Sequence, residues 1–251
     1  MSEAQPIVRF EHVSMQFPGV LANDDVSLTI RKGEVVGLVG ESGCGKSTLG
    51  RIVAGILPPS EGRILRDGID LLNRSSAESR EMKLRTQMIF QDPYASLNPR
   101  LRIGDILAEP LLVHDRVKNA SEARERVGAL LDMVGLNKAW GERFPHEFSG
   151  GQRQRISIAR ALALEPALIV ADEPVSALDV NVQAQVLNLM LDLRERMGLS
   201  YLFIAHDLAV VRAFCDRVAV MYLGRIVEEG AAAEVLGAPR HPYTRALLES
   251  V

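Results

Sequence analysis

The segment from Gly40 to Ser47 holds the densest set of residues suited to chemistry, and it is followed by Thr48. Its glycines allow successive backbone N–H groups to curl around phosphate oxygens. A lysine at this spacing reaches the β- and γ-phosphates of a nucleotide, and the next hydroxyl ligates Mg²⁺. An apolar run at 35–39 precedes the segment and a helical stretch starts at Lys46, which is the context that a phosphate-binding loop requires. The predicted loop comprises Gly40, Glu41, Ser42, Gly43, Cys44, Gly45, Lys46, Ser47 and Thr48, with Cys44 interpreted as a small side chain rather than a redox group.

A second candidate is the acidic pair Asp172-Glu173, which follows the apolar run 168–171. Open α/β sheets bind ligands beyond the carboxyl ends of their strands. There Asp172 would bind Mg²⁺ directly or through water, and Glu173 would point toward an attacking water. The alternative is a strand-end acidic pair that caps the next helix. Beside a phosphate-binding loop, the metal and water interpretation is favoured.

A third candidate is the run from Ser149 to Gln152, ahead of a helical stretch that ends before Pro166. Ser149 is a good N-cap residue, so the simplest interpretation is a capped helix. The functional interpretation is a second helix N-terminus that binds phosphate. A chain with one phosphate-binding loop would use such a site for the nucleotide of a neighbouring subunit.

The elements that position these residues follow an α/β pattern. Apolar runs at 168–171 and 201–205 predict buried strands, and between them an apolar stripe from Val182 to Met197, closed by Gly198, predicts a helix. Strand, helix and strand in this order indicate a parallel crossover unit. The helical stretch from Lys46 is predicted to stop at Pro58-Pro59.

The remaining segments predict an edge and an insertion. Segments 7–30 and 217–227 show shorter apolar alternation, which predicts antiparallel strands at an edge. Segment 92–147 shows no comparable strand. It carries a helical face over 127–134, for which Ser121 is the expected N-cap, with Gly135 past the end.

Composition restricts the classes of protein. The 251 residues carry 29 Lys+Arg against 32 Asp+Glu, a net charge of -3 that disfavours nucleic acid as a partner. With 47% hydrophobic and 24% charged residues, the chain is expected to be globular. No apolar stretch is long enough to span a membrane and no signal peptide is evident, so a soluble protein is expected. Its two cysteines are expected to be reduced thiols in a cytosolic protein.

Together, the phosphate-binding loop, the acidic pair Asp172-Glu173 and the segment 149–152 resemble the ATP-binding subunit of ABC transporters over nearly the whole chain. The segment 149–152 matches the signature motif of that family, with Phe148 where leucine is commoner. The further matches are Phe17 at the aromatic residue that stacks on adenine, Gln91 at the Q-loop, Ser176 to Asp179 at the D-loop and His206 at the switch histidine.

The resemblance implies an α/β fold: a P-loop NTPase core with a mostly parallel sheet, an antiparallel β edge subdomain and a helical insertion. One ABC ATPase domain would span 1–251, with its core at 1–91 and 161–251 and a helical subdomain at 92–160 that carries the signature motif. It also implies Mg²⁺-dependent ATP hydrolysis. The implied catalytic residues are Glu173 as general base, His206 at the γ-phosphate, Gln91 and Lys46, and the implied metal ligands are Ser47, Gln91 and Asp172.

The same resemblance implies partners. Ser149, Gly151 and Gln152 would face the nucleotide bound by a second ATPase subunit, identical or different, with Asp179 at the shared surface. The helical insertion after Gln91 would grip a permease at the cytoplasmic face of the membrane, so that Gln91 senses nucleotide and moves the docking surface.

Three further segments resemble the oligopeptide, dipeptide and nickel importer group of the family. They are 91–100, 144–147 and His241-Pro242-Tyr243-Thr244. This resemblance implies uptake of a peptide-like or nickel-type substrate, delivered by a substrate-binding protein; peptide, nickel and glutathione all stay open. The alternative is a soluble ABC-type ATPase acting on nucleic acid or the ribosome, against which stand the single cassette and the lack of a heptad insert between Lys46 and Ser149. A non-catalytic regulator would have lost Glu173 or His206.

Overall fold

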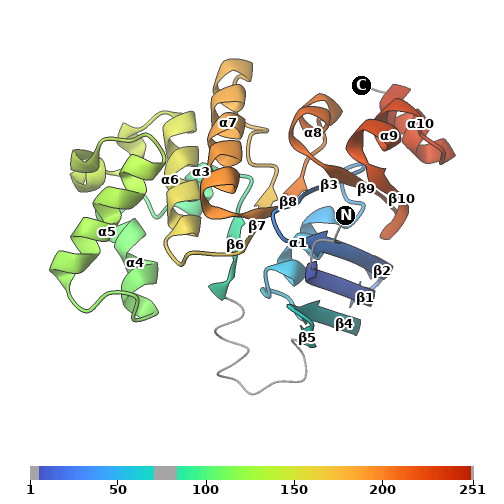
Figure 1. The fold of residues 1–251 in the computed structure, drawn as a ribbon, viewed down its shortest axis with the longest axis horizontal. Helices are drawn as coiled ribbons and strands as arrows, with labels where there is room; N and C mark the ends of the chain where they lie inside the picture. Colours follow the sequence, from blue (N-terminus) through green and yellow to red (C-terminus); the bar gives the residue numbers. More distant parts are fainter. Residues whose placement is uncertain (1–5, 71–83, 250–251) are drawn as a thin grey trace. The chain divides into compact units, whose positions relative to one another are not determined.

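The computed structural model describes residues 6–70 and 84–249 of the 251-residue chain. Figure 1 shows its helices and strands. The described residues divide into two compact units, each with its own elements. Unit 1 is drawn from residues 1–88, 167–173 and 193–251, and unit 2 from residues 89–166 and 174–192.

The larger sheet of unit 1 has the strand order β10-β9-β3-β8-β7-β6 (Figure 1). Its strands are β3 (Val35–Val39), β6 (Thr86–Ile89), β7 (Leu168–Asp172), β8 (Ser200–Ile204), β9 (Arg217–Tyr222) and β10 (Arg225–Ala231). The three predicted buried strands are confirmed as β3, β7 and β8, in which every residue is buried. Because β8 pairs in parallel with both β7 and β3, the predicted crossover unit is confirmed as well.

The prediction of antiparallel edge strands for 217–227 is correct for β10 and wrong for β9. β9 lies inside the sheet and pairs in parallel with β3, with Val39 opposite Val220. Only β10 runs antiparallel, at the edge. The middle of β9 is a continuous buried run from Val218 to Met221, the pattern of a strand covered on both faces. A short apolar pattern does not specify the direction of the neighbouring strand.

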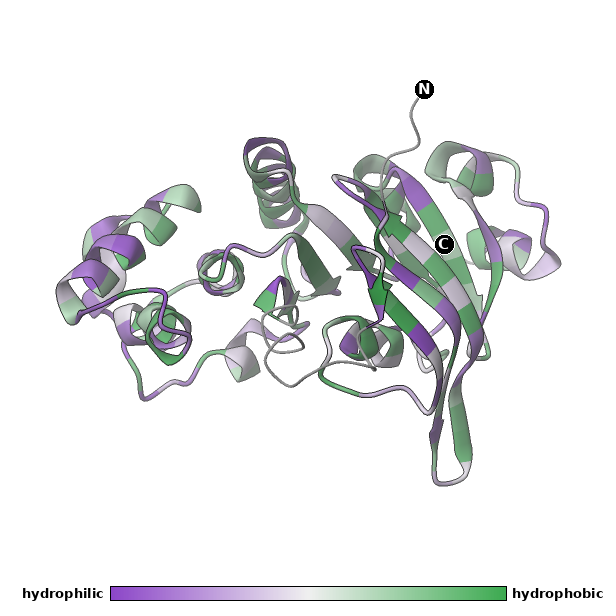
Figure 2. Cartoon of the chain, turned by 60° about the horizontal axis from the view of Figure 1, so that its bottom comes forward, coloured by the Kyte–Doolittle hydropathy of each residue, from purple (hydrophilic) through white to green (hydrophobic). Residues whose placement is uncertain are grey.

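A second, four-stranded sheet of unit 1 is antiparallel, with the order β2-β1-β4-β5. Its strands are β1 (Pro6–Phe17), β2 (Val20–Arg31), β4 (Glu61–Arg66) and β5 (Ile69–Asp70). The hairpin of β1 and β2 confirms the antiparallel strands predicted for 7–30. Buried and exposed residues alternate along it, and Figure 2 shows the matching alternation of hydropathy. One face of this sheet therefore covers the core.

The core of unit 1 joins both sheets. Phe10 and Leu28 from the antiparallel sheet belong to one cluster with Leu38 of β3, Leu49 of the first helix and Ile204 of β8. All five are at most 2% exposed. This packing fixes the phosphate-binding loop and the strand ends around it in one body.

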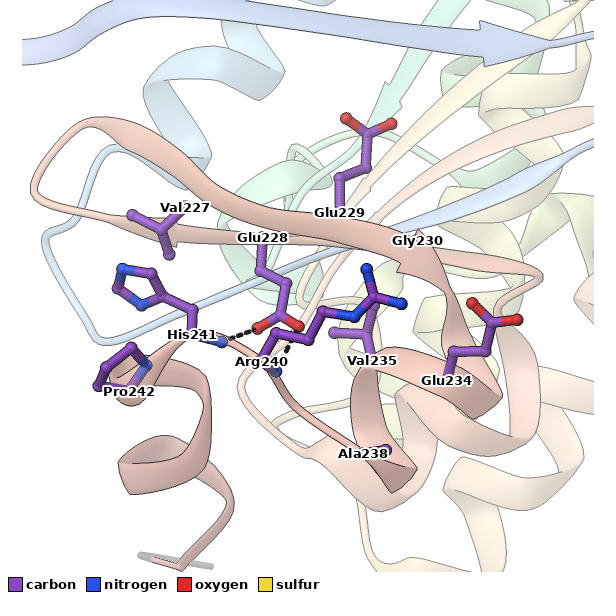
Figure 3. A pocket seen from close by; sticks show the side chains of 10 residues that line it. All are labelled: Val227, Glu228, Glu229, Gly230, Glu234, Val235, Ala238, Arg240, His241 and Pro242. Atoms are coloured by element: carbon purple, nitrogen blue, oxygen red, sulfur yellow. Dashed lines mark hydrogen bonds between the residues drawn. The ribbon is translucent and has the colours of Figure 1, made fainter.

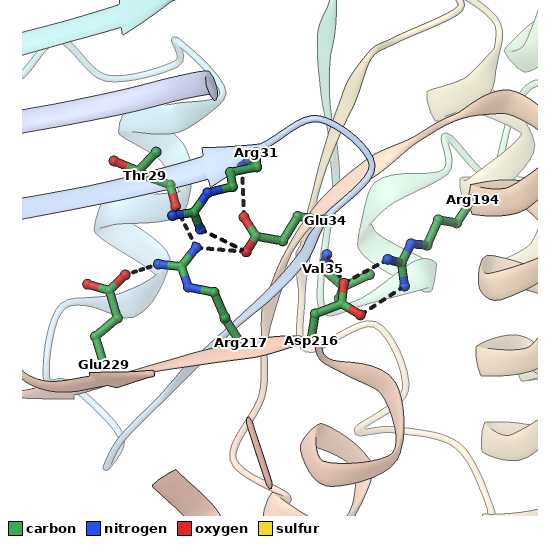
Figure 4. Close-up of polar contacts among 8 residues, drawn as sticks. All are labelled: Thr29, Arg31, Glu34, Val35, Arg194, Asp216, Arg217 and Glu229. Atoms are coloured by element: carbon green, nitrogen blue, oxygen red, sulfur yellow. Dashed lines mark hydrogen bonds and ion pairs between the residues drawn. The ribbon is translucent and has the colours of Figure 1, made fainter. Parts of the chain in front are cut away.

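Ion pairs and hydrogen bonds stabilise the edge of the larger sheet at which β3 and β9 begin, opposite the edge that carries the phosphate-binding loop (Figure 4). Arg217, the first residue of β9, donates to the Thr29 carbonyl at 3.1 Å and to the Glu34 carboxylate at 2.8 Å. Asp216 accepts the N–H of Val35 at 2.8 Å and thereby pins the start of β3. These charges are used structurally at this edge, so the carboxyl edge of β3, β7 and β8 is the one available for ligands.

Unit 1 also contains α1 (Lys46–Val53), α8 (Leu208–Phe214), α9 (Ala232–Gly237) and α10 (Pro242–Glu249). The prediction that the first helix continues to Pro58 is wrong. Its cap is Ala54, and Gly55 adopts a φ of +71° while Ile56 N–H bonds back to the Arg51 carbonyl. This left-handed glycine ends the helix before the prolines can act.

Unit 2 is built from helices. They are α3 (Pro93–Ser96), α4 (Ile103–Val113), α5 (Ala120–Met133), the 3₁₀ turns η1 (Lys138–Glu142) and η2 (Pro145–Glu147), α6 (Gly150–Leu162) and the first part of α7 (Val180–Met197). None of the described residues from 90 to 166 forms a strand, so the helical insertion predicted for 92–147 is confirmed. Gly198 follows α7 with a φ of +66°, as predicted.

The predicted N-cap of α5 is wrong by two residues. Asn119, not Ser121, precedes the helix, and its side chain accepts the N–H of Glu122 at 3.0 Å. Both are good capping residues, but only Asn119 has its side-chain oxygen within reach of the N3 amide while Ser121 lies inside the first turn. Gly135 follows the helix with a φ of +71°, as expected.

In the part of the chain that the structure describes, no helix combines the length and the apolar character that crossing a bilayer demands.

Candidate functional site

The loop from Gly40 to Thr48 joins the end of β3 to the start of α1 in unit 1. Two of its glycines are required by both conformation and space. Gly40 has a φ of +148°, and a Cβ there would lie 2.2 Å from the Met221 carbonyl oxygen; Gly45 has a φ of +107°, and a Cβ there would lie 2.1 Å from the Ala22 carbonyl oxygen. The loop is therefore seated against the backbone of neighbouring strands, and only glycine fits at these positions.

Lys46, the first residue of α1, is 6% exposed, and its ammonium group points back into the loop. Nζ donates to the carbonyl oxygens of Gly40 and Glu41, each at 2.7 Å, and lies 3.8 Å from Cys44 Sγ. The loop thus holds a positive charge beside the unpaired N–H groups that begin a helix, an arrangement suited to an anion.

Cys44 lies inside this loop as a buried side chain. Its sulfur is one of the atoms that a Cβ on Gly40 would meet, at 3.0 Å. Burial raises the pKa of its thiol, and the nearby Lys46 ammonium reduces that effect without cancelling it. A protonated buried thiol is a poor nucleophile, so the residue fills space in the loop.

Asp172 is the last residue of β7 and is 5% exposed. The Ser47 hydroxyl donates a hydrogen bond to its Oδ1 at 3.0 Å. Burial raises the pKa of this carboxyl, an effect that the hydrogen bond from Ser47 reduces. The fold therefore brings a hydroxyl and a carboxylate together beside the Lys46 ammonium, which gives two hard oxygen donors of the kind that Mg²⁺ prefers.

Glu173 follows directly, with a φ of +47° that is unusual for a residue with a side chain. Its N–H bonds to the Ile204 carbonyl at 2.9 Å, which holds the strained backbone at the end of β8. Its Oε2 lies 3.1 Å from Nδ1 of His206. The strained turn thus places the Glu173 carboxylate beside His206, whereas the Asp172 carboxylate accepts the hydrogen bond from Ser47.

The signature-like segment lies in unit 2, where Ser149 caps α6. Gln152 N–H donates to Ser149 Oγ at 3.3 Å, and Ser149 N–H donates to Gln152 Oε1 at 2.9 Å, a reciprocal capping box. The N-cap predicted from sequence is confirmed. Gly151, the second residue of α6, packs so closely on the start of α7 that a Cβ would lie 2.3 Å from Val182 Cγ1.

Asp179 caps α7 in the same unit, with Oδ1 accepting the N–H of Val182 at 3.1 Å. The segment that carries Asp179 and the helix that carries Gly151 are therefore in contact, and a Cβ on Gly150 would also touch Leu178 at 3.4 Å.

Gln91 and Phe17 occupy more open positions. Gln91 belongs to unit 2, follows β6 and is exposed. It precedes α3, which Asp92 caps by accepting the Tyr94 N–H at 2.7 Å. Phe17 ends β1 in unit 1, opposite Val20, and is 37% exposed. Their roles in binding nucleotide stay predictions.

Sequence reasoning missed the residues that fasten the segment after Gln91 to α6. The Arg153 guanidinium carbon lies 3.6 Å from the centre of the Tyr94 ring, and Arg153 Nε donates to the Pro145 carbonyl at 2.8 Å. Ser96 and Ser157 join the same two elements through their hydroxyls, 3.2 Å apart. The only signal was that Tyr94 stands inside the segment 91–100 and that Arg153 directly follows the segment 149–152, since no local pattern pairs them.

The structure thus gathers the predicted site residues in two groups. Unit 1 brings together the phosphate-binding loop, Asp172, Glu173 and His206 at the carboxyl edge of β3, β7 and β8. Unit 2 brings together the capped start of α6 and the segment ending at Asp179. Gln91 belongs to unit 2 and Phe17 to unit 1.

Known proteins resemble the chain in sequence and in fold. Residues 23–176 match the family described as ABC transporter. The chain is 51% identical over 252 residues to the oligopeptide transport ATP-binding protein OppF of Bacillus subtilis, covering 98% of this chain and 83% of that protein. It is 52% identical over 231 residues to the dipeptide transport ATP-binding protein DppF of Haemophilus influenzae, covering 92% and 70%.

Among solved structures, the dimeric post-hydrolysis state of the ATP-binding cassette MJ0796, bound to ADP and Pi, superposes with a TM-score of 0.79. The match covers 90% of this chain and 98% of that one, at 30% identity. At this level of likeness the two chains share their fold.

Proposed function

The chain belongs to the ABC transporter family, and from that premise we propose that it is the ATP-binding and ATP-hydrolysing subunit of a peptide importer. The observation that carries the proposal is the grouping of Lys46, Ser47, Asp172 and Glu173 at one edge of the sheet in unit 1. This edge supplies a cation for phosphates, oxygen ligands for a metal and a carboxylate for water, which are the parts that phosphoryl transfer to water requires.

Mg²⁺ fits the residues at this edge. At nucleotide sites Mg²⁺ is usually bound by one or two protein side chains and by phosphate oxygens. Ser47 and Asp172 would hold it, since their oxygens already lie 3.0 Å apart, and Gln91 would complete its surroundings. When bound, Mg²⁺ neutralises charge that develops on the β- and γ-phosphates.

Glu173 is the proposed general base that orients the attacking water. An ionised carboxylate only accepts hydrogen bonds, so the contact with His206 requires a proton on Nδ1. The imidazole then fixes the direction of the Glu173 side chain and turns Nε2 outward, where it would meet the γ-phosphate. Lys46 stabilises the phosphate charge through the transfer.

The likeness to a dimeric cassette supports a second ATPase subunit, either identical or different. Ser149, Gly151 and Gln152 would contact the nucleotide held by that subunit, with Asp179 at the shared surface. The helices after Gln91 would dock on permease subunits at the cytoplasmic face of the membrane, and a substrate-binding protein would deliver the cargo.

A peptide is the favoured cargo, because the relatives are named for oligopeptide and dipeptide transport. Nickel is the alternative carried by the sequence resemblance. A reconstitution tests this: the full chain is combined with candidate permease subunits in lipid vesicles, and ATP-driven uptake of a labelled peptide mixture and of Ni²⁺ is measured. Peptide uptake that is lost with Lys46→Ala supports the proposal, whereas nickel uptake alone overturns the choice of cargo.

The purified chain, without vesicles, tests whether the protein is an ATPase. The purified chain is expected to hydrolyse ATP only when Mg²⁺ is present. Hydrolysis that responds to nucleic acid or ribosomes and not to the permease would contradict the transporter assignment.

A further inference from the structure

The chain returns to the phosphate-binding loop near its end, in a segment to which the proposed function gives no role. Residues 238–241 join α9 to α10, and α10 begins with Pro242-Tyr243-Thr244. This stretch, α9 and β10 line an open cavity of about 670 Å³, whose lining Figure 3 shows. The segment was singled out in the sequence as the His-Pro-Tyr-Thr run.

The segment is anchored by one carboxylate of β10. Oε1 of Glu228 accepts the N–H of Arg240 at 2.8 Å, and Oε2 accepts the N–H of His241 at 3.0 Å (Figure 3). Burial alone would raise the pKa of this carboxyl, but the hydrogen bonds that it accepts hold that pKa below its ordinary value. The carboxylate is therefore ionised at neutral pH, and it fixes the entry to α10.

Tyr243 projects from this anchored turn onto the end of the central sheet. Its ring packs against the ring of Tyr222, the last residue of β9, with centroids 4.2 Å apart and an angle of 36° between the planes. The Tyr243 hydroxyl oxygen accepts the backbone N–H of Glu41 at 3.0 Å, across 202 positions of sequence. Burial raises the pKa of this hydroxyl, which keeps it neutral at physiological pH.

One peptide group of the loop is consequently held at both ends. The N–H of Glu41 and the carbonyl of Gly40 belong to the same peptide bond, and in a trans peptide they point in opposite directions. The N–H donates to Tyr243 at 3.0 Å, and the carbonyl accepts from Lys46 Nζ at 2.7 Å. Hydrogen bonds in such a chain polarise one another and restrain the peptide plane that lies between them.

We propose that Tyr243 is a positioning residue for the phosphate-binding loop: its hydroxyl fixes the Gly40-Glu41 peptide and thereby the place of the Lys46 ammonium. This inference rests on the proposed function of the loop as the nucleotide site. The C-terminal segment is then part of the nucleotide site without touching nucleotide, because it sets the geometry of the lysine that does.

The test compares two matched substitutions in the full chain. Tyr243→Phe removes the hydroxyl and keeps the ring stack, whereas the control Tyr222→Phe removes the same atom from the ring beside it. Binding of Mg-ADP is measured by calorimetry, and amide hydrogen exchange of a peptide spanning 39–46 is measured without nucleotide. Tyr243→Phe is expected to weaken ADP binding about 3- to 10-fold and to speed exchange in the loop, while Tyr222→Phe changes binding less than twofold.

A role in overall stability would not give this result, because both variants are expected to melt within about 2 °C of the unchanged protein. Unchanged ADP affinity in Tyr243→Phe beside normal binding by the unchanged protein overturns the role of Tyr243 alone. An unchanged protein that binds no ADP overturns the proposed function and this inference together. Equal losses in the two variants also overturn the inference, since they would assign the effect to ring packing.

Glu228 provides an independent check on the path from the tail to the loop. Glu228→Gln leaves one acceptor oxygen for two N–H donors, so the turn before Tyr243 is loosened. If the turn acts through the Tyr243 hydroxyl, Glu228→Gln combined with Tyr243→Phe weakens ADP binding no further than the larger single effect. If the fold-loss of ADP affinity in the double variant equalled the product of the two single losses, Glu228 would not act through the Tyr243 hydroxyl.

Discussion

Nδ1 of His206 lies 3.1 Å from Oε2 of Glu173, where Glu173 is the first residue after β7 and His206 is the second after β8, at the same edge of the sheet. The Glu173 side chain is 19% exposed and the His206 side chain 61%, so the carboxylate is sheltered while the imidazole faces solvent. The fold thereby places a sheltered carboxylate beside a histidine that is exposed to solvent. This pairing makes the roles of the two residues separable by mutation.

Glu173→Gln is expected to leave ATP binding within about twofold and to slow hydrolysis by about 100-fold or more, because the amide keeps the shape of the side chain and loses the base. Single-turnover hydrolysis and nucleotide binding are measured on the same preparation. Lys46→Ala is the contrasting variant, which is expected to weaken both. Hydrolysis by Glu173→Gln at the unchanged rate would show that another group orients the water.

His206→Ala is expected to slow hydrolysis less than Glu173→Gln does, because the Glu173 carboxylate remains as the general base. Combining the two substitutions should slow hydrolysis below the rate of Glu173→Gln alone, because the proposed contact of His206 with the γ-phosphate does not depend on the Glu173 carboxylate. Single-turnover rates of the three variants give the comparison. A double variant that is no slower than Glu173→Gln would show that His206 acts only through Glu173, without a contact with phosphate of its own.

Asp172→Asn is expected to abolish Mg²⁺-dependent hydrolysis and yet to keep or raise the stability of the nucleotide-free protein. Burial raises the pKa of Asp172 above the ordinary 3.8, so the charged form is disfavoured in the fold. Such a group costs stability at neutral pH, and the cost disappears as pH falls through the raised pKa toward 3.8. Asparagine still accepts the Ser47 hydroxyl and carries no charge.

The measurement is the free energy of unfolding of both proteins in denaturant between pH 7 and about pH 4. The advantage of Asp172→Asn is expected to be largest at neutral pH and to shrink toward acid. An advantage that grows toward acid would mean that the Asp172 charge stabilises the fold, which would contradict desolvation as the dominant cause of its pKa.

Features formed by neighbouring residues could be predicted from the sequence, whereas contacts between residues far apart in the chain could not. The phosphate-binding loop and the strand before Asp172 are contiguous runs, and each carries its own turn or hydrophobic signal. The contact of Tyr243 with Glu41 spans 202 positions, and although each residue stands in a recognised segment, neither segment indicates the other. The direction of β9 was missed for a related reason, because it depends on which strand lies beside it and not on its own residues.

The end of α1 and the cap of α5 were missed at shorter range. In each case two residues with the right chemistry stand within a few positions, and the geometry of one hydrogen bond decides between them. Gly55 ends α1 ahead of the prolines, and Asn119 caps α5 ahead of Ser121. Residue propensities mark both residues as able to end or cap the helix, but they do not show which of the two does so.

Gly151→Ala separates packing from function at the signature segment. The new methyl group would lie 2.3 Å from Val182 Cγ1, and a β-branched side chain in a helix has little rotamer freedom with which to yield. We expect a loss of about 1–3 kcal/mol in the free energy of unfolding. Val182→Ala removes the obstructing methyl groups, so adding it to Gly151→Ala should restore most of that stability. Denaturant unfolding of the two single variants and the double variant measures this.

Hydrolysis in the same three proteins then reports on the proposed role toward a second subunit. If Gly151 must leave room for the partner's nucleotide, the double variant regains stability while its ATPase rate stays at least about tenfold low, because the methyl group still faces that nucleotide. Val182→Ala alone should keep most of the rate. Full recovery of hydrolysis in the double variant would reduce Gly151 to a packing residue between α6 and α7, and a double variant that stays unstable would show that the contact with Val182 is not the cause of the loss.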